Sequence, residues 1–113
     1  MDIKAIDWQM TVERLNGNIE AAREVLALFL KELPELQKMI NDAYQSNQIE
    51  LLYEHLHRLH GGCCYVGVPT LKISTYQFCE AAKKKRVSEL SALLMAFNEA
   101  ANAVNHAAKG MVF

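Results

Sequence analysis

Apolar residues recur every three or four positions along most of this chain of 113 residues, a spacing that predicts amphipathic helices. The longest such face lies between Asn18 and Ser46: Ala22, Leu26, Phe29, Leu33, Leu36, Ile40 and Ala43. Its register is the same on both sides of Pro34, so we interpret this proline as a kink within one helix, at a typical cost of about 3 kcal/mol. Asn18 can cap the first turn of that helix.

A short helix is predicted before it, capped by Asp7 and ended by Asn16-Gly17, because both of those residues tolerate positive φ. This helix is expected to direct three apolar side chains inward: Trp8, Val12 and Leu15. After the long helix, the polar stretch 46–48 predicts a tight turn into a third helix. The apolar face of the third segment is Leu52, Leu56, Leu59, Cys63 and Val66.

Two more helices complete the pattern. Gly67-Val68-Pro69 predicts a turn, with Pro69 as the first residue of a fourth helix that ends in the basic stretch 83–86. Its predicted buried residues are Leu71, Thr75, Phe78 and Ala82. Ser88 is expected to cap the last helix. The apolar face of the last helix is Leu90, Leu94, Phe97, Ala101, Val104 and Ala108.

Four apolar faces joined by short loops predict an all-α fold, an antiparallel up-down-up-down four-helix bundle with a short extra N-terminal helix laid across it. We expect residues 1–113 to form a single domain, with the core bundle at about 18–109. A hydrophobic content of 51% is enough for one core without disulfides or metal.

Charge and cysteine content exclude several classes of protein. A formal net charge of −1 does not indicate a nucleic-acid-binding surface. Three cysteines, of which Cys63 and Cys64 are adjacent, make a poor disulfide framework. The sequence contains neither a signal peptide nor an apolar stretch of transmembrane length, so we expect a cytoplasmic protein with no direct membrane contact.

The most informative residue is His57. On a helical wheel it lies about 140° from Leu52, which places it on the outer surface together with His60, Gly61 and Cys64. Two glycines within the same helix, Gly61 and Gly62, cost about 1 kcal/mol each relative to alanine. The helix therefore gives up stability to keep space open one turn from His57.

The spacing of His57, His60, Gly61 and Gly67 resembles the motif of the histidine phosphotransfer (HPt) domain: a histidine, a basic residue three positions later, and glycines four and ten positions later. The match is closer still to the C-terminal HPt domain of GacS/BarA-type hybrid sensor histidine kinases, and it is carried by His57, Leu59, His60, Gly61, Cys63, Tyr65, Gly67, Val68 and Pro69. Residues 6–8 and 27–36 also resemble the start of such domains. The chain departs from the pattern at Cys79, where many HPt domains have glutamine or another polar residue.

The resemblance implies a phosphorelay intermediate in a two-component regulatory system. His57 would accept a phosphoryl group from an aspartate of one receiver domain, in a hybrid sensor kinase, and pass it to the receiver of a response regulator. His60 would support the reaction by hydrogen bonding, and Gly61 would clear the approach. The chain would need no cofactor of its own, since Mg²⁺ is expected on the partner receiver. It would have no autonomous kinase activity, and we expect a monomer, whether free or as the cytoplasmic C-terminal part of an inner-membrane sensor kinase.

Two alternatives come from other functional classes. His57, His60 and Cys64 lie on one helical face and have side chains that bind zinc, although the outer two are about 10 Å apart along a straight helix. The chain could also be a purely structural interaction bundle, in which His57 accepts no phosphoryl group.

Overall fold

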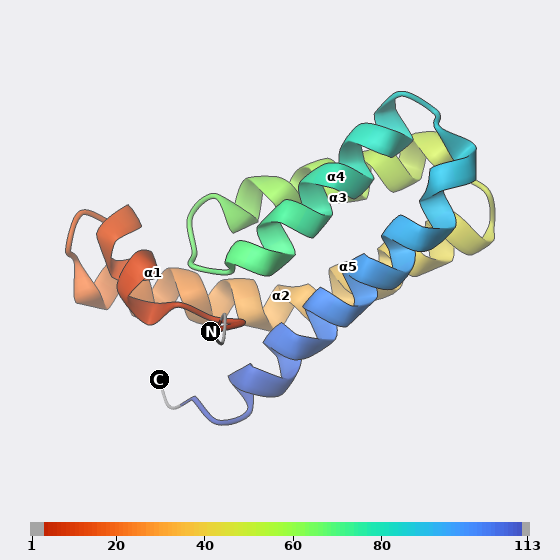
Figure 1. Cartoon of the computed structure of the whole chain (residues 1–113). Helices are drawn as coiled ribbons and strands as arrows, with labels where there is room; N and C mark the ends of the chain where they lie inside the picture. Colours follow the sequence, from red (N-terminus) through yellow and green to blue (C-terminus); the bar gives the residue numbers. More distant parts are fainter. Residues whose placement is uncertain (1–3, 112–113) are drawn as a thin grey trace.

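The computed structural model describes residues 4–111, which form five α-helices and, within that range, no strand (Figure 1). The helices are α1 (Trp8–Arg14), α2 (Ile19–Gln45), α3 (Ile49–Cys63), α4 (Pro69–Lys83) and α5 (Val87–Ala108). The all-α class predicted from the sequence is confirmed.

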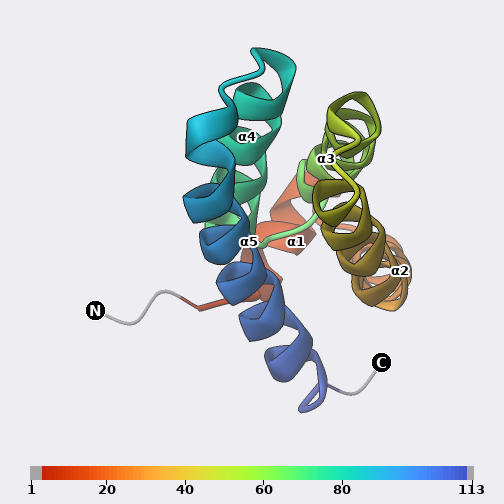
Figure 2. The same ribbon diagram turned by 90° about the vertical axis from the view of Figure 1, so that its right-hand side faces the viewer.

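Helices α2 to α5 form an antiparallel bundle in which each helix packs against two neighbours. α2 contacts α3 and α5, while α4 contacts α3 and α5, so the four helices enclose one core (Figure 2). The turns that join α2 to α3 and α4 to α5 lie at one end of the bundle (Figure 1). The α3–α4 turn lies at the other end, beside α1.

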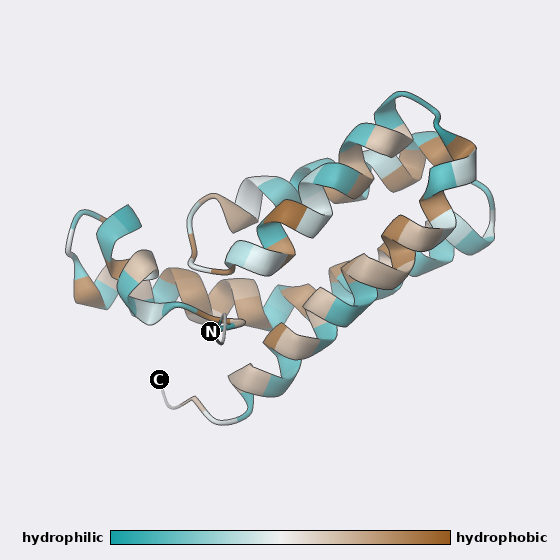
Figure 3. Ribbon diagram, in the orientation of Figure 1, coloured by the Kyte–Doolittle hydropathy of each residue, from teal (hydrophilic) through white to brown (hydrophobic). Residues whose placement is uncertain are grey.

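The core contains the faces that the sequence predicts. Every predicted core residue of α2 and α3 is buried, as is Val66 in the turn that follows α3. Polar and apolar residues alternate along each helix (Figure 3). Inside the bundle, the rings of Phe78 and Phe97 pack together with their centroids 5.9 Å apart. In α2, Leu33 and Leu36 are buried on either side of Pro34. Burial of each such side chain contributes about 1.5–3 kcal/mol, which offsets the cost of the proline and keeps the helix continuous.

The ends of the helices confirm some predictions and correct others. Asp7 and Asn18 cap α1 and α2, since their side chains accept hydrogen bonds from the backbone N–H groups of Met10 and Ala21. The prediction that Ser88 caps the last helix is wrong: α5 begins at Val87, its N-cap is Arg86, and no side chain caps it. The preceding turn instead closes through Lys85, which adopts positive φ.

The predicted inward face of the first helix is also wrong in part. Thr11 is the buried residue of α1, whereas Trp8, Val12 and Leu15 are only partly buried. A helix of 7 residues makes only about two turns, so at the end of the bundle its larger side chains stay at the margin of the core. Ala108, at the end of α5, is likewise half-buried.

A polar cluster between α2 and α5 does not follow from the apolar pattern. The Gln37 side-chain N–H group donates to the Asn98 and Asn102 side-chain oxygens, at 3.1 and 3.0 Å. Asn41 and Asn98 exchange a pair of amide hydrogen bonds, both 2.9 Å long. These directional bonds fix the register of α5 against α2.

Candidate functional site

The site is built on α3, whose buried face turns His57 outward. The core-facing side of α3 contains Leu52, Leu56 and Leu59, all of them buried. His57 points away from that side and is exposed, as the helical wheel predicts. Tyr53 lies one turn earlier on α3. The centroid of its ring is 5.7 Å from the centroid of the His57 imidazole, and the two ring planes make an angle of 37°. The imidazole therefore has an aromatic neighbour on one side and solvent on the other.

His60 lies on the side of α3 that meets α4. Its ring contacts the ring of Tyr76, with centroids 5.4 Å apart, so it is partly buried and not fully exposed. This burial lowers the pKa of His60 below its ordinary value, and the charges of Lys72 and His57 lower it further. His60 is consequently neutral near pH 7, when it has one N–H donor. The sequence analysis did not identify Lys72 or Tyr76 as part of this site.

The two adjacent glycines of α3, Gly61 and Gly62, have different surroundings. A Cβ atom on Gly61 would meet nothing within 4 Å, which leaves open space one turn from His57. A Cβ atom on Gly62 would lie 3.3 and 3.4 Å from two ring carbons of Phe29, so Gly62 allows α2 to approach α3 closely. Of these two glycines, Gly61 has the open surroundings that an approaching partner requires.

Gly67 has a different role from the one predicted. Its φ is not positive, so the turn itself does not require glycine. A Cβ atom there would collide with the carbonyl oxygen of Asp7 and lie 3.0 Å from the Cβ atom of Met10. The Asp7 N–H donates to the Gly67 carbonyl at 2.6 Å, and the Gly67 N–H donates to the Thr11 hydroxyl at 2.8 Å. Gly67 is therefore needed for the close approach of the N-terminal segment.

Arg14 of α1 strengthens this contact. Its guanidinium group donates to the Cys63 carbonyl at 2.9 Å and to the Val66 carbonyl at 2.6 Å. Carbonyl groups at the end of a helix have no partner within the helix, and a cation is favoured there. α1 thus secures the C-terminal end of the helix that carries His57.

The cysteines differ in their surroundings. Cys63 is buried, and burial raises the pKa of its thiol to about 12. Cys64 is exposed, as predicted. Cys79 is buried in the core, and burial raises the pKa of its thiol as well, so it offers no polar group to the surface at the position where the sequence departs from the HPt pattern.

The structure does not favour the zinc alternative. Within residues 4–111, no group of three or more His, Cys, Asp or Glu side chains is arranged to hold a metal ion. The set formed by His57, His60 and Cys64 is therefore not brought together as a metal site.

None of the helices within residues 4–111 has the length and apolar character needed to cross a membrane.

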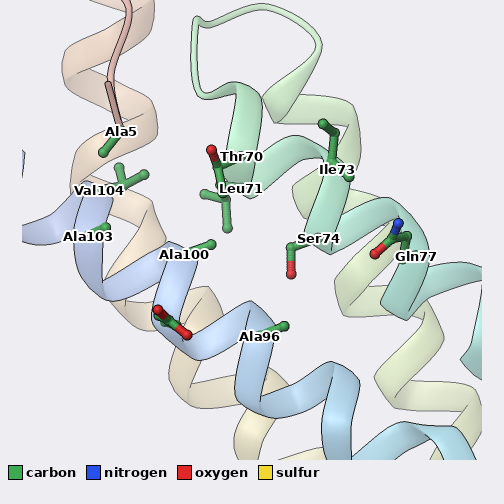
Figure 4. Close-up of a pocket in the computed structure, with 11 residues that line it drawn as sticks. Ala5, Thr70, Leu71, Ile73, Ser74, Gln77, Ala96, Ala100, Ala103 and Val104 are labelled. Atoms are coloured by element: carbon green, nitrogen blue, oxygen red, sulfur yellow. The ribbon is translucent and has the colours of Figure 1, made fainter. Parts of the chain in front are cut away.

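A pocket with a volume of about 470 Å³ lies elsewhere, between α4 and α5. There Leu71 and Ser74 of α4 point toward Ala100 of α5 (Figure 4). His57 and His60 do not line it. The candidate chemistry is therefore on an open surface, which suits a macromolecular partner better than an enclosed small molecule.

Comparison with known proteins decides the family. The family model described as "Hpt domain" matches residues 24–108. The chain belongs to the Hpt domain family. A crystal structure of the HPT domain from a sensor hybrid histidine kinase of Shewanella has a TM-score of 0.78 and 26% identity, and the match covers 99% of this chain and 100% of that one. The match to that structure extends over α1, which precedes the residues matched by the family model.

Similar curated proteins are much longer. The signal transduction histidine-protein kinase BarA of Shigella flexneri is 34% identical over 67 residues, which is 59% of this chain and 7% of the kinase. The sensor histidine kinase GacS of Pseudomonas protegens is 27% identical over 93 residues, 82% of this chain and 10% of the kinase. The similarity to the GacS/BarA branch inferred from the sequence is thus confirmed, and the chain spans a tenth or less of these two relatives.

Proposed function

We propose that this Hpt domain is a phosphorelay intermediate in which His57 accepts a phosphoryl group from the aspartyl phosphate of a receiver domain and passes it to a second receiver. The observation that carries this proposal is the position of His57: an exposed imidazole on α3, with open space over Gly61 one turn away. Family membership supports the reaction type, and the geometry supports the residue.

The chemistry needs little from the domain beyond a positioned nucleophile. A lone pair of the neutral His57 imidazole forms the N–P bond while the O–P bond to the receiver aspartate breaks, and the aspartate leaves as a carboxylate with the bonding electrons. The His60 N–H group donates a hydrogen bond to a phosphoryl oxygen, and Gly61 leaves room for the receiver. The receiver is expected to supply Mg²⁺ for charge stabilisation.

The partners follow from the relatives. We expect the donor to be a receiver domain of a hybrid sensor kinase and the acceptor to be the receiver of a response regulator, because BarA and GacS are sensor histidine kinases. The domain would act in the cytoplasm as a monomer, and it would have no kinase activity on its own.

Phosphotransfer from a phosphorylated receiver tests the proposal. The wild-type domain should gain label rapidly, and the product should be acid-labile and comparatively stable to base, as phosphohistidine is. His57→Gln should gain none. His106→Gln is a matched control, because His106 is also exposed but lies in the last turn of α5. Undiminished transfer to His57→Gln, or an acid-stable product, would show that the assignment is wrong.

A further inference from the structure

The imidazole of His57 lies against an aromatic ring of its own helix. Tyr53 is four residues earlier on α3, and the two ring centroids are 5.7 Å apart with 37° between the planes. Side chains of an α-helix point toward its N-terminus, so the side chain of His57 extends over the turn that contains Tyr53. A tilted pair of aromatic rings at this separation attracts. The contact therefore favours those orientations of the imidazole that keep it beside the Tyr53 ring.

The Tyr53 ring is itself held in place. It is half-buried and packs against the hydrophobic core, as does Ile49 one turn earlier on the same face of α3. Packed side chains stay in one rotamer for most of the time, whereas exposed side chains change rotamer freely. His57 is exposed, so its imidazole would have that freedom without a fixed neighbour. Tyr53 gives the exposed imidazole a surface that is anchored in the core.

The opposite side of the imidazole is open. By the same rule of direction, a side chain at position 61 would extend back over His57. Gly61 has no side chain, and a Cβ atom there would meet nothing within 4 Å. The imidazole thus has an aromatic ring on the side toward the N-terminus of α3 and free space on the side toward its C-terminus. A partner protein can reach it from the direction of Gly61.

This inference rests on the proposed function and deepens it. We propose that Tyr53 is a positioning residue, whose ring holds the His57 imidazole in one orientation and presents its attacking nitrogen to a receiver on the Gly61 side. Phosphoryl transfer requires the nucleophile and the leaving oxygen to lie roughly in line, so a nucleophile that is oriented beforehand reacts faster. Tyr53 acts through His57 and takes no part in the bonds that form and break.

NMR spectroscopy of the unphosphorylated domain tests the orientation without a receiver. Three-bond couplings about the Cα–Cβ bond of His57 should show one dominant rotamer in the wild-type domain and averaging over several rotamers in Tyr53→Ala. The ring current of Tyr53 should shift the carbon-bound protons of the imidazole, and Tyr53→Ala should lose this shift. Tyr53→Phe should keep both signatures, because the contact is made by the ring.

Transfer kinetics with two donors test the effect on the reaction. The initial rate of transfer from a phosphorylated receiver should fall about two- to tenfold in Tyr53→Ala, and Tyr53→Phe should restore it. Phosphoramidate is a small donor that can approach the imidazole from many directions, so its rate should fall less. A merely structural role of Tyr53 would lower both rates by the same factor.

Tyr44→Ala is the matched control. Tyr44 is another half-buried tyrosine that packs against the core, but it lies in the last turn of α2. Its replacement should change neither the His57 couplings nor the ratio of the two rates, even where it lowers the melting temperature. Unchanged couplings in Tyr53→Ala, or an equal loss of rate with both donors, would overturn the proposal. If the wild-type domain gains no phosphoryl group from a receiver, the proposed function fails, and the couplings still decide whether Tyr53 orients His57.

Discussion

Replacement of Gly61 by leucine should separate the stability of the domain from its reaction. Gly61 lies in the last turn of α3, and a Cβ atom there meets nothing within 4 Å, so a larger side chain causes no collision inside the domain. Loss of the glycine should stabilise the helix by up to about 1 kcal/mol. For a domain of this size, that corresponds to an increase of about 4 °C in melting temperature.

The same leucine should slow phosphotransfer. Residues four apart on a helix have Cβ atoms about 5–6 Å from each other, so the added side chain stands beside the His57 imidazole in the path of the receiver. A displacement of about 1 Å in a reacting complex can cost about 100-fold in rate, and we expect Gly61→Leu to lose at least about tenfold. Gly61→Ala should gain the same stability and keep most of the rate.

Thermal unfolding followed by circular dichroism, and initial rates of transfer from a phosphorylated receiver, measure the two effects on the same samples. A Gly61→Leu protein that is as stable as wild type and transfers at the wild-type rate would refute the argument that Gly61 provides access. A lower melting temperature would refute the argument that the space is empty.

Three further outcomes are expected. Gly67→Ala should destabilise the domain by about 1–3 kcal/mol in thermal unfolding, because its Cβ atom collides with the Asp7 carbonyl; an unchanged melting temperature would contradict this. In the folded domain, iodoacetamide should modify Cys64 but not Cys63, whose thiol has a pKa of about 12, and mass spectrometry before and after unfolding checks the difference. The pKa of His60 is lowered in the folded domain, so the unfolded chain binds this proton more readily below about pH 6.5. The free energy of unfolding should therefore decrease as the pH falls through that range. Urea titrations at a series of pH values should show a weaker decrease for His60→Gln.

The apolar spacing predicted the bundle because each helix buries one continuous face. Leu26 and Leu33 lie on the same side of α2 whatever their neighbours are, so helical geometry alone places them. The exposure of His57 follows from the same rule. Ser88 was misassigned because a serine near a helix start is a good cap only if the backbone turns there, and the turn at Lys85 moved the start to Val87.

The remaining features of the site depend on contacts between helices, which one helical wheel does not contain. Tyr76 could not have been assigned to the surroundings of His60 from one helix, because the contact between their rings depends on how α3 packs against α4. The role of Gly67 needed the position of Asp7, about 60 residues earlier in the chain. Arg14 is similarly distant from the carbonyl groups it binds.

The attachment of α1 has a consequence for the order in which the domain assembles. The hydrogen bond from Arg14 to Val66 spans 52 positions of sequence, whereas the turns between successive bundle helices bring together residues only a few positions apart. Closing a long loop has an entropic cost before its contacts form, so local hairpins such as α3–α4 are expected to form early and α1 to dock late. Amides near the Asp7–Gly67 contact should then exchange with solvent through a local opening in which α1 detaches while the four-helix core persists.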